Sequence, residues 1–361
     1  MGPAAVPYPR YLITLIGPNS GGAGDGEPGA AVRDATTGRV IDRVPGQMDV
    51  YSAVTGTGNN RLFYLAARSD RADTARREPD IGQIPPGGAF RLQLDDTGRI
   101  VELSAVPGVP EPERASHGPN ALAATADGRT LAYAVTAPRD WRLPPPPVWP
   151  VCDEHKDEPV QAEAHFPPAE VRLVTVATGE RMVWRAGSGG FVSDLSLSAD
   201  GRRMAFSWNG RPEDRGIHVV DLPETTPGAV ISTPSRLVVP DRNTLMEHNL
   251  GRSGLGCLGD AVISADGSTL YVTAARGEAG GQAVTRLAQV SVADGQLLGI
   301  AYERPFRDPG NILYGWGPLA IAPSGQHALI AYTGHVGLID LNTRQLTELP
   351  IGEHGAHSIA W

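Results

Sequence analysis

The chain has few aromatic residues, almost no lysine and little cysteine. Aromatic residues make up 6% of its 361 residues, Lys156 is the one lysine, and Cys152 and Cys257 are the two cysteines. Two cysteines allow at most one disulfide and decide no compartment. No run reaches 18 apolar residues, so the sequence predicts no membrane span. The formal net charge of −9 argues against a general binder of nucleic-acid phosphates, and we expect no nucleic-acid partner.

The start of the chain, MGPAAVPYPRYLITLIG, also lacks the features of a secretion signal. It has no basic n-region, and its apolar run from Tyr11 to Ile16 is too short for a signal peptide. The chain as written is therefore expected to be soluble. An abrupt start of this kind is also what a trimmed extracytoplasmic ectodomain of a membrane-tethered protein would show.

Glycine and proline are abundant, with 44 and 32 residues, and this abundance excludes long helices and coiled coils. The chain is 41% hydrophobic, which is enough apolar material for a core and argues against wholesale disorder. A turn-rich fold of many short strands remains.

Four segments align without gaps and organise the chain. They read TADGRTLAYA at 125–134, SADGRRMAFS at 198–207, SADGSTLYVT at 264–273 and APSGQHALIA at 322–331, with a degenerate copy around Asn59 and Asn60. Asp-Gly between two alternating apolar runs is a strong hairpin signal. A second hairpin follows each of these, so the unit has four strands, A to D, as in a β-propeller blade.

Counting these units predicts an all-β, six-bladed β-propeller with four-stranded antiparallel blades. Blades 2 to 6 are expected at 48–108, 119–187, 191–240, 256–303 and 316–351. The N-terminus supplies three strands, and the C-terminal strand His357–Trp361 completes their blade as its innermost strand, which closes the ring. We expect one domain over 1–361, with an N-terminal extension at 1–9 and a long insertion loop at 137–170 in blade 3.

The pattern S-x-D-G-R-x-x-A-F/Y-S/A resembles the WD40-like (PD40) repeat of TolB-type propellers. The resemblance spans nearly the whole chain and is strongest in the four hairpins. The arrangement is also similar to uncharacterised propeller domains of actinobacteria, which are often membrane-tethered. The resemblance implies a fold and a binding role, and it carries no catalytic residue because the repeat motif is structural.

Nearly all excess loop length is expected on one face of the propeller. A–B and C–D turns share one face and are short, apart from a looser C–D turn around Pro223–Gly228 in blade 4. B–C and D–A connections share the other face. The long ones are 19–29, 69–88, 137–170 and 241–259. Long loops on a rigid scaffold are usually where binding occurs, although neutral growth of insertions is the alternative.

The insertion in blade 3 holds four consecutive prolines between Trp141 and Trp149. This composition suits a lid, a ligand for an aromatic groove, or simply a stiffened surface loop.

The inner strands place polar residues at the mouth of the axis. Counting back six residues from each hairpin Asp gives Asp194 and Asp260, whereas the equivalent positions in blades 6 and 3 are Pro318 and Ala121. The ligand-binding candidates at this mouth and on its loops are His117, Asn120, Trp141, Trp149, Asp194, Glu247, His248, Asp260, Trp316, His354 and His357.

Two interpretations of Asp194 and Asp260 are open. They could bind Ca²⁺ or another divalent cation, which would activate water as in propeller lactonases. They could instead hydrogen-bond backbone amides of the neighbouring blade. Cys152 and His155 lack the spacing of a zinc site, and a disulfide between Cys152 and Cys257 is geometrically demanding. The chain has no serine-peptidase elbow, P-loop or H-E-x-x-H motif.

We favour a non-enzymatic, monomeric propeller without a cofactor. It would bind a protein, peptide, glycan or small-molecule ligand on the face that bears the long B–C and D–A loops. The alternative is a metal-dependent, lactonase-like hydrolase or another enzyme that processes small molecules with the axial acids. A third, weaker interpretation is a purely structural domain tethered to a membrane partner. The sequence names neither the ligand nor the compartment.

Overall fold

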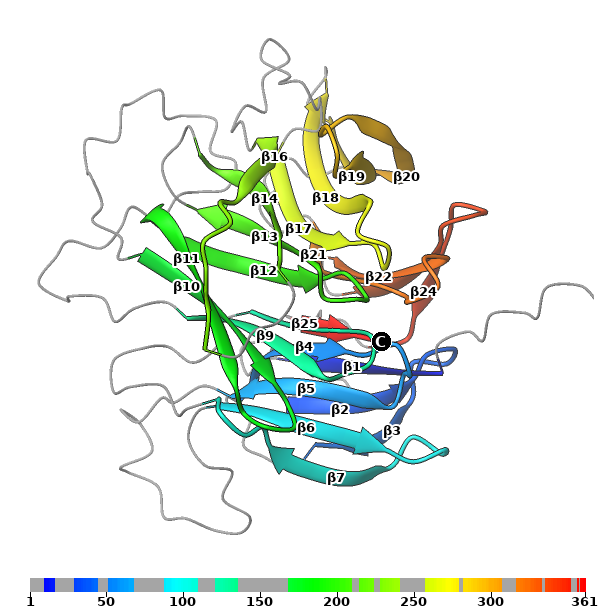
Figure 1. Ribbon diagram of the computed structural model, residues 1–361. Helices are drawn as coiled ribbons and strands as arrows, with labels where there is room; N and C mark the ends of the chain where they lie inside the picture. The colour runs from blue at the N-terminus through cyan, green and yellow to red at the C-terminus, as the bar shows by residue number, and fades with distance from the viewer. Residues whose placement is uncertain are drawn as a thin grey trace, which may run out of the picture.

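The computed structural model describes most of the strands and tight turns of the chain. The described residues are 10–16, 29–44, 51–67, 88–109, 121–135, 168–209, 214–223, 228–240, 257–278, 282–306, 316–332, 335–351, 356 and 358–361. They form six antiparallel sheets arranged as the blades of a propeller (Figure 1), which confirms the predicted fold class and blade count. Within these ranges no helix has the length and apolar character needed to cross a membrane.

The strands of each blade follow one another from the axis outward. In that order, blade 1 is β25 (Ser358–Ala360), β1 (Tyr11–Ile16), β2 (Gly29–Asp34) and β3 (Val40–Arg43); blade 2 is β4 (Tyr51–Gly56), β5 (Leu62–Ala67), β6 (Gly88–Leu94) and β7 (Ile100–Ala105); blade 3 is β8 (Leu122–Ala124), β9 (Thr130–Val135), β10 (Pro168–Thr175) and β11 (Arg181–Gly189). Blade 4 is β12 (Phe191–Leu197), β13 (Arg203–Asn209), β14 (Gly216–Asp221) and β16 (Arg236–Pro240); blade 5 is β17 (Cys257–Ile263), β18 (Thr269–Glu278), β19 (Gln282–Ser291) and β20 (Leu297–Phe306); blade 6 is β21 (Trp316–Ile321), β22 (His327–Tyr332), β23 (His335–Asp340) and β24 (Gln345–Leu349). β10 thus begins inside the predicted insertion 137–170; the rest of that insertion before Pro168 and the extension 1–9 lie outside the described residues.

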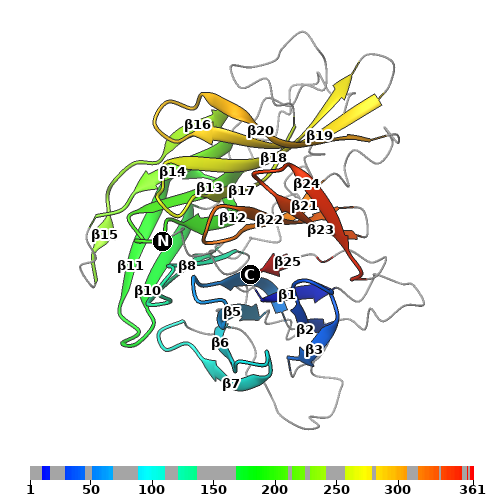
Figure 2. The same ribbon diagram turned by 90° about the vertical axis from the view of Figure 1, so that its right-hand side faces the viewer.

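The C-terminal strand closes the ring as predicted. β25 pairs with β1 from Ile13↔Ala360 to Leu15↔Ser358, and Figure 2 shows it at the middle of the ring. The hydroxyl of Ser358 accepts the N–H of Val54 in blade 2 at 3.1 Å. On the other side, the indole of Trp361 donates to the carbonyl of Ala320 in blade 6 at 3.2 Å. The last residues therefore join blade 1 to both of its neighbours.

The hydrophobic core lies between the blades. Six clusters of buried residues each unite two neighbouring blades, and together they complete the circle. The cluster between blades 3 and 4 packs Trp184 against Phe206, with ring centroids 5.1 Å apart. Because each sheet buries both of its faces against neighbours, the strands carry long apolar runs such as Leu62–Ala67, in which every residue is buried.

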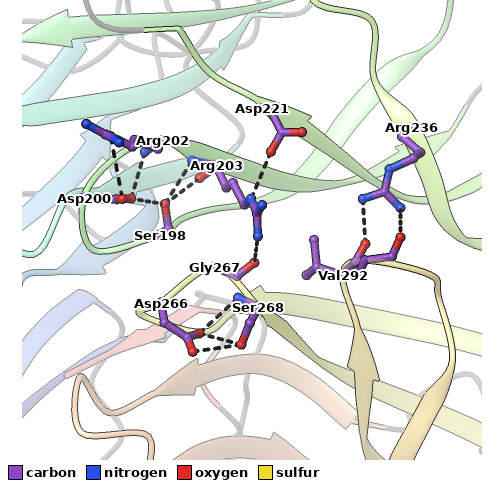
Figure 3. Close-up of polar contacts among 11 residues, drawn as sticks. Ser198, Asp200, Arg202, Arg203, Asp221, Arg236, Asp266, Gly267, Ser268 and Val292 are labelled. Atoms are coloured by element: carbon purple, nitrogen blue, oxygen red, sulfur yellow. Dashed lines mark hydrogen bonds and ion pairs between the residues drawn. The ribbon is translucent and has the colours of Figure 1, made fainter.

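The repeated Asp is a turn residue, and its role is structural. In blade 4, Oδ1 of Asp200 accepts the Ser198 hydroxyl at 2.7 Å and the Arg202 N–H at 3.0 Å (Figure 3). Gly201 follows at a φ of 69°, in the left-handed region that glycine tolerates. In the degenerate copy Asn60 takes this conformation, with a φ of 55°. Its side-chain oxygen accepts the N–H groups of Arg10 and Tyr11, which fixes the start of β1.

The A–B turns of consecutive blades are joined by backbone hydrogen bonds. Gly58 donates to Ala126 at 2.8 Å, Ala126 to Ala199 at 3.3 Å, and Ala199 to Ala265 at 2.8 Å. The equivalent position in blade 6 is Pro323, which has no N–H to donate. Small residues thus allow the turns to approach one another closely around the axis.

Arginines add further links between blades 4 and 5. The guanidinium of Arg203 in β13 donates to Asp221 at 2.9 Å and to the carbonyl of Gly267 in the next A–B turn at 2.8 Å (Figure 3). Arg236 in β16 donates to the carbonyl of Val292 at 2.6 Å. The contacts with Gly267 and Val292 tie blade 4 to turns of blade 5, whereas the contact with Asp221 lies within blade 4.

The C–D connection of blade 4, for which the sequence predicts a longer turn around 223–228, also carries a strand that the sequence does not predict. Between β14 and β16 the chain forms β15 (Val230–Ile231), which pairs in parallel with β11 and becomes a fifth, outermost strand of blade 3. Figure 2 shows β15 beside β11, away from its own blade. Ile231 is buried in the cluster shared by blades 3 and 4, and this burial explains why the connection reaches across.

Candidate functional site

Two aspartates occupy equivalent places on neighbouring inner strands. Asp194 is the extra residue of a bulge in β12, between Ser193 and Leu195, and has a φ of 46°. Asp260 lies within the irregularity of β17 between Leu258 and Ala261. Bulges bend a strand and change the direction of its side chains, so alternation along the strand does not decide where these carboxyl groups point.

The two carboxyl groups share a hydrogen bond across the interface of blades 4 and 5. Oδ2 of Asp260 also accepts the backbone N–H of Leu319 in blade 6, at 3.2 Å. Asp194 receives a hydrogen bond from Ser193, and the enclosed hydroxyl of Ser207 faces it without completing a bond of good geometry. The pair therefore connects three blades near the axis.

Burial dominates the electrostatics of the pair. Each residue keeps a partly exposed surface, but its carboxyl group lies among protein atoms. Desolvation raises the pKa of Asp194, although the Ser207 and Ser193 hydroxyls oppose the shift. Desolvation also raises the pKa of Asp260, well above its usual value, and the charge of Asp194 raises it further. Two adjacent carboxylates repel each other, so the pair holds a shared proton to a higher pH than an isolated Asp would.

A cavity of about 250 Å³ runs along the axis beside this pair. All six inner strands line it, together with turn residues such as Ala126, Ala199 and Ala265. Leu195, which follows Asp194, and Leu319, which donates to Asp260, are both lining residues. The acid pair therefore lies at the end of the cavity that is remote from the short turns.

Of the other residues predicted for this region, only the backbone of Trp316 can be placed. Trp316 opens β21, the inner strand of blade 6, which lies against β17. Ala121 is buried before β8, and Pro318 is half-buried in the irregular part of β21. The remaining candidates lie outside the described residues: His117, Asn120, Trp141, Trp149, Glu247, His248, His354 and His357. Their role at the site stays a prediction, as does the state of Cys152 and Cys257.

The pair offers little to a metal beyond its own oxygens. Within the ranges that the structure describes, no group of three or more His, Cys, Asp or Glu side chains is arranged to hold an ion. One oxygen of Asp260 is already occupied by an amide of the next blade. The sequence left two interpretations open for Asp260, metal binding and a hydrogen bond to a backbone amide of the next blade. The contact observed is the hydrogen bond to the amide.

Ser193 and Ser207 belong to this site and were not singled out from the sequence. They face each other across β12 and β13 in register, on either side of the bulged Asp194. Ser207 is the last residue of the repeated segment SADGRRMAFS, so its place on β13 was readable. The bulge was not, because β12 itself, FVSDLSL, contains no glycine or proline to indicate an irregular strand.

Comparison with known proteins identifies the fold and no family. No protein-family model and no curated protein sequence matches the chain. Among solved structures, TolB from Acinetobacter baumannii superimposes with a TM-score of 0.53 and 11% identity, covering 99% of this chain and 68% of TolB. The structure of a nidogen/laminin complex gives 0.52 and 11%, covering 97% of each chain. A putative 6-phosphogluconolactonase from Bacteroides fragilis overlaps less well, with a TM-score of 0.47 at 13% identity.

Such low identities establish a shared architecture and nothing finer. They confirm the predicted resemblance to TolB-type propellers at the level of fold, whereas the PD40 repeat itself stays a prediction. Fold alone does not fix function, because propellers carry many unrelated activities. The chain is a six-bladed β-propeller similar in architecture to TolB.

Proposed function

We propose that this chain is a non-enzymatic propeller that recognises a protein, peptide or glycan through the face bearing its B–C and D–A connections. The observation that carries the proposal is the asymmetry of the connections. The A–B turns of blades 2 to 5 are closed by the same side-chain hydrogen bonds, from Thr57, Thr125, Ser198 and Ser264 to the Asn or Asp two residues later. On the other face the strand bounds leave 17–28, 68–87, 136–167 and 241–256 between consecutive strands.

This asymmetry favours binding because the two faces have different requirements. The A–B turns are tied to one another around the axis, so their backbone groups are already used and their lengths are constrained. The turn hydrogen bonds do not set the lengths of the connections between the strands at the opposite face, and a rigid scaffold presents such segments for recognition. No side-chain pattern among the described residues names the partner.

The test compares two sets of variants on an immobilised peptide library and a glycan array. Replacing residues 138–166 with a short Gly-Ser linker should abolish binding to the peptides or glycans that the unaltered chain retains. Arg129→Glu with Arg202→Glu is the matched control, because both arginines are exposed on the short-turn face. Binding lost in the control and kept in the linker variant would overturn the choice of face.

The acid pair supports a second candidate, a metal-dependent hydrolase. Raised carboxyl pKa values near an axial opening are typical of functional sites as well as of structural ion networks. Calorimetry with Ca²⁺ and with Zn²⁺, together with a screen of lactone hydrolysis, separates the two candidates. Heat of binding and turnover that both vanish in Asp194→Asn would favour the hydrolase, whereas neither signal is expected for the binding propeller.

A further inference from the structure

Residues 228–235, which we call the strap, cross from blade 4 to the outer edge of blade 3. Gly228 donates its N–H to the carbonyl of Arg181 at 3.0 Å, and Val183 donates to Ala229 at 3.2 Å. The indole of Trp184 donates to the carbonyl of Thr233 at 3.1 Å. These bonds, with the two-residue parallel pairing of β15, satisfy the edge of β11 that would otherwise be open.

Little apolar burial holds the strap in place. Ile231 is its buried side chain, at 3% exposure, whereas Val230 is 61% exposed. Ser232 and Pro234 are exposed as well. A segment with one buried anchor and a few edge hydrogen bonds belongs to the low-stability end of a fold, where local opening is easiest.

A buried histidine lies under the end of the strap. His218 on β14 is 4% exposed, and its ring stacks on Phe206 with centroids 5.7 Å apart. Nε2 lies 2.7 Å from the carbonyl oxygen of Asp214, which can only accept, so Nε2 carries the proton. Nδ1 is therefore the acceptor, and it receives the hydroxyl of Ser235 at 3.1 Å.

The surroundings of His218 are unequal in charge. Asp214 is the charged group that acts on the ring, from the chain segment before β14, with Arg215 beside it in sequence. β13 contributes Phe206 and Trp208, which are uncharged, and the strap contributes the neutral Ser235. Arg236, the next residue, is directed to the carbonyl of Val292. A positive ring would thus be attracted to the Asp214 side, and loss of the Ser235 contact would open it to water on the strap side.

We propose that the strap is an acid-sensitive latch: protonation of His218 favours its release from blade 3 and uncovers the edge of β11. Burial lowers the pKa of His218, although Asp214 opposes the shift. A proton therefore binds more tightly to the open state, in which the ring reaches water, than to the closed state. Release frees the carbonyl of Arg181 and the N–H of Val183 and removes the partner of the Trp184 indole.

The test follows hydrogen exchange at Val183 and the indole NMR signal of Trp184 between pH 7.5 and 4.5. We expect at least a tenfold loss of protection at Val183 in acid, with a midpoint below that of an exposed histidine. Protection should become independent of pH in His218→Asn, whose side-chain oxygen can still accept from Ser235. His335→Asn is the matched control, because His335 is exposed on β23, and it should keep the original midpoint.

Ser235→Ala keeps His218 and removes the strap's contact with it. We expect Val183 to exchange faster in this variant even at pH 7.5. Protection of Val183 that persists to pH 4.5, or is lost with an unchanged midpoint in His218→Asn, would overturn the proposal.

Discussion

Oδ2 of Asp260 accepts the backbone N–H of Leu319 at 3.2 Å, across the interface of blades 5 and 6. A residue type that suggests metal chemistry in the sequence is thus engaged in joining two inner strands. Its carboxyl neighbour, Asp194, completes a contact that spans blades 4 to 6. This geometry engages the two axial acids in contacts between blades, in keeping with the proposal that recognition uses the B–C and D–A connections.

The acid pair should make stability fall as the pH rises. Both folded-state pKa values are raised by desolvation, so the stability of the protonated pair is fully present below the unfolded value of about 3.9. It is lost as the pH rises through the raised folded pKa. Asp194→Asn should therefore be more stable than the unaltered chain at pH 8, with a smaller advantage at pH 4, as measured by urea unfolding.

Glu102→Gln serves as the control for that comparison, since Glu102 is exposed on β7. It should leave the pH dependence unchanged. An Asp194→Asn variant that is destabilised equally at both pH values would show that the pair does not share a proton.

The turn aspartate of blade 4 should have the opposite pH dependence. The N–H of Arg202 and the hydroxyl of Ser198 lower the pKa of Asp200, so its stabilisation is present above about pH 3.9 and lost as the pH falls through the lower folded value. Asp200→Ala should cost about 1 kcal/mol at pH 7 and less at pH 3. Urea unfolding at the two pH values measures this, and an equal cost at both would contradict the charge argument. Asp200→Asn, which retains an acceptor oxygen, should cost less than Asp200→Ala.

Ring closure should depend on Gly56. A Cβ at this position would overlap the backbone oxygen of Trp361, so Gly56→Ala must displace either β4 or the end of the chain. We expect a loss of about 1–3 kcal/mol in thermal unfolding, as for other overpacked sites. Gly299→Ala on β20 is the control, because a Cβ there meets no atom within 4 Å, and its stability should be nearly unchanged.

Arg203 should stabilise the fold more through its hydrogen bond to the Gly267 carbonyl of blade 5 than through its ion pair with Asp221 in blade 4. Arg203 donates to Gly267 O and to Asp221, whose side chain is 67% exposed. Exposed ion pairs contribute little, so Asp221→Asn should cost about 0–0.5 kcal/mol. Arg203→Met also loses the bond to Gly267 and should cost about 1 kcal/mol more in urea unfolding. Equal losses in the two variants would assign the stabilisation to the ion pair instead.

The blades of the propeller could be predicted from the sequence because the patterns that indicate their turns and strands are local. Asp200-Gly201 and Asp266-Gly267 set the turns, and alternation around them set the strands, so the blade count and the closing strand followed. β15 could not be predicted from the sequence. Its two residues carry no periodicity, and its pairing depends on a buried place for Ile231 between blades 3 and 4.

The candidate site was readable in part. Equal spacing from the hairpin turns brings Asp194 and Asp260 to the same level of adjacent strands, and that level was predicted. Their mutual hydrogen bond depends on bulges and on a φ of 46° at Asp194, which no motif indicates. Spacing thus predicts the position of a residue along a strand. The direction of its side chain at a bulge depends on the backbone conformation, which the structure shows and the spacing does not.

The most direct test of the proposed function is a hydrogen-exchange footprint of the chain bound to a peptide or glycan recovered from the arrays. We predict protection confined to 17–28, 68–87, 136–167 and 241–256. Protection centred on the A–B turns at 57–61, 125–129, 198–202 and 264–268 would contradict it and place recognition at the opposite mouth of the axial cavity.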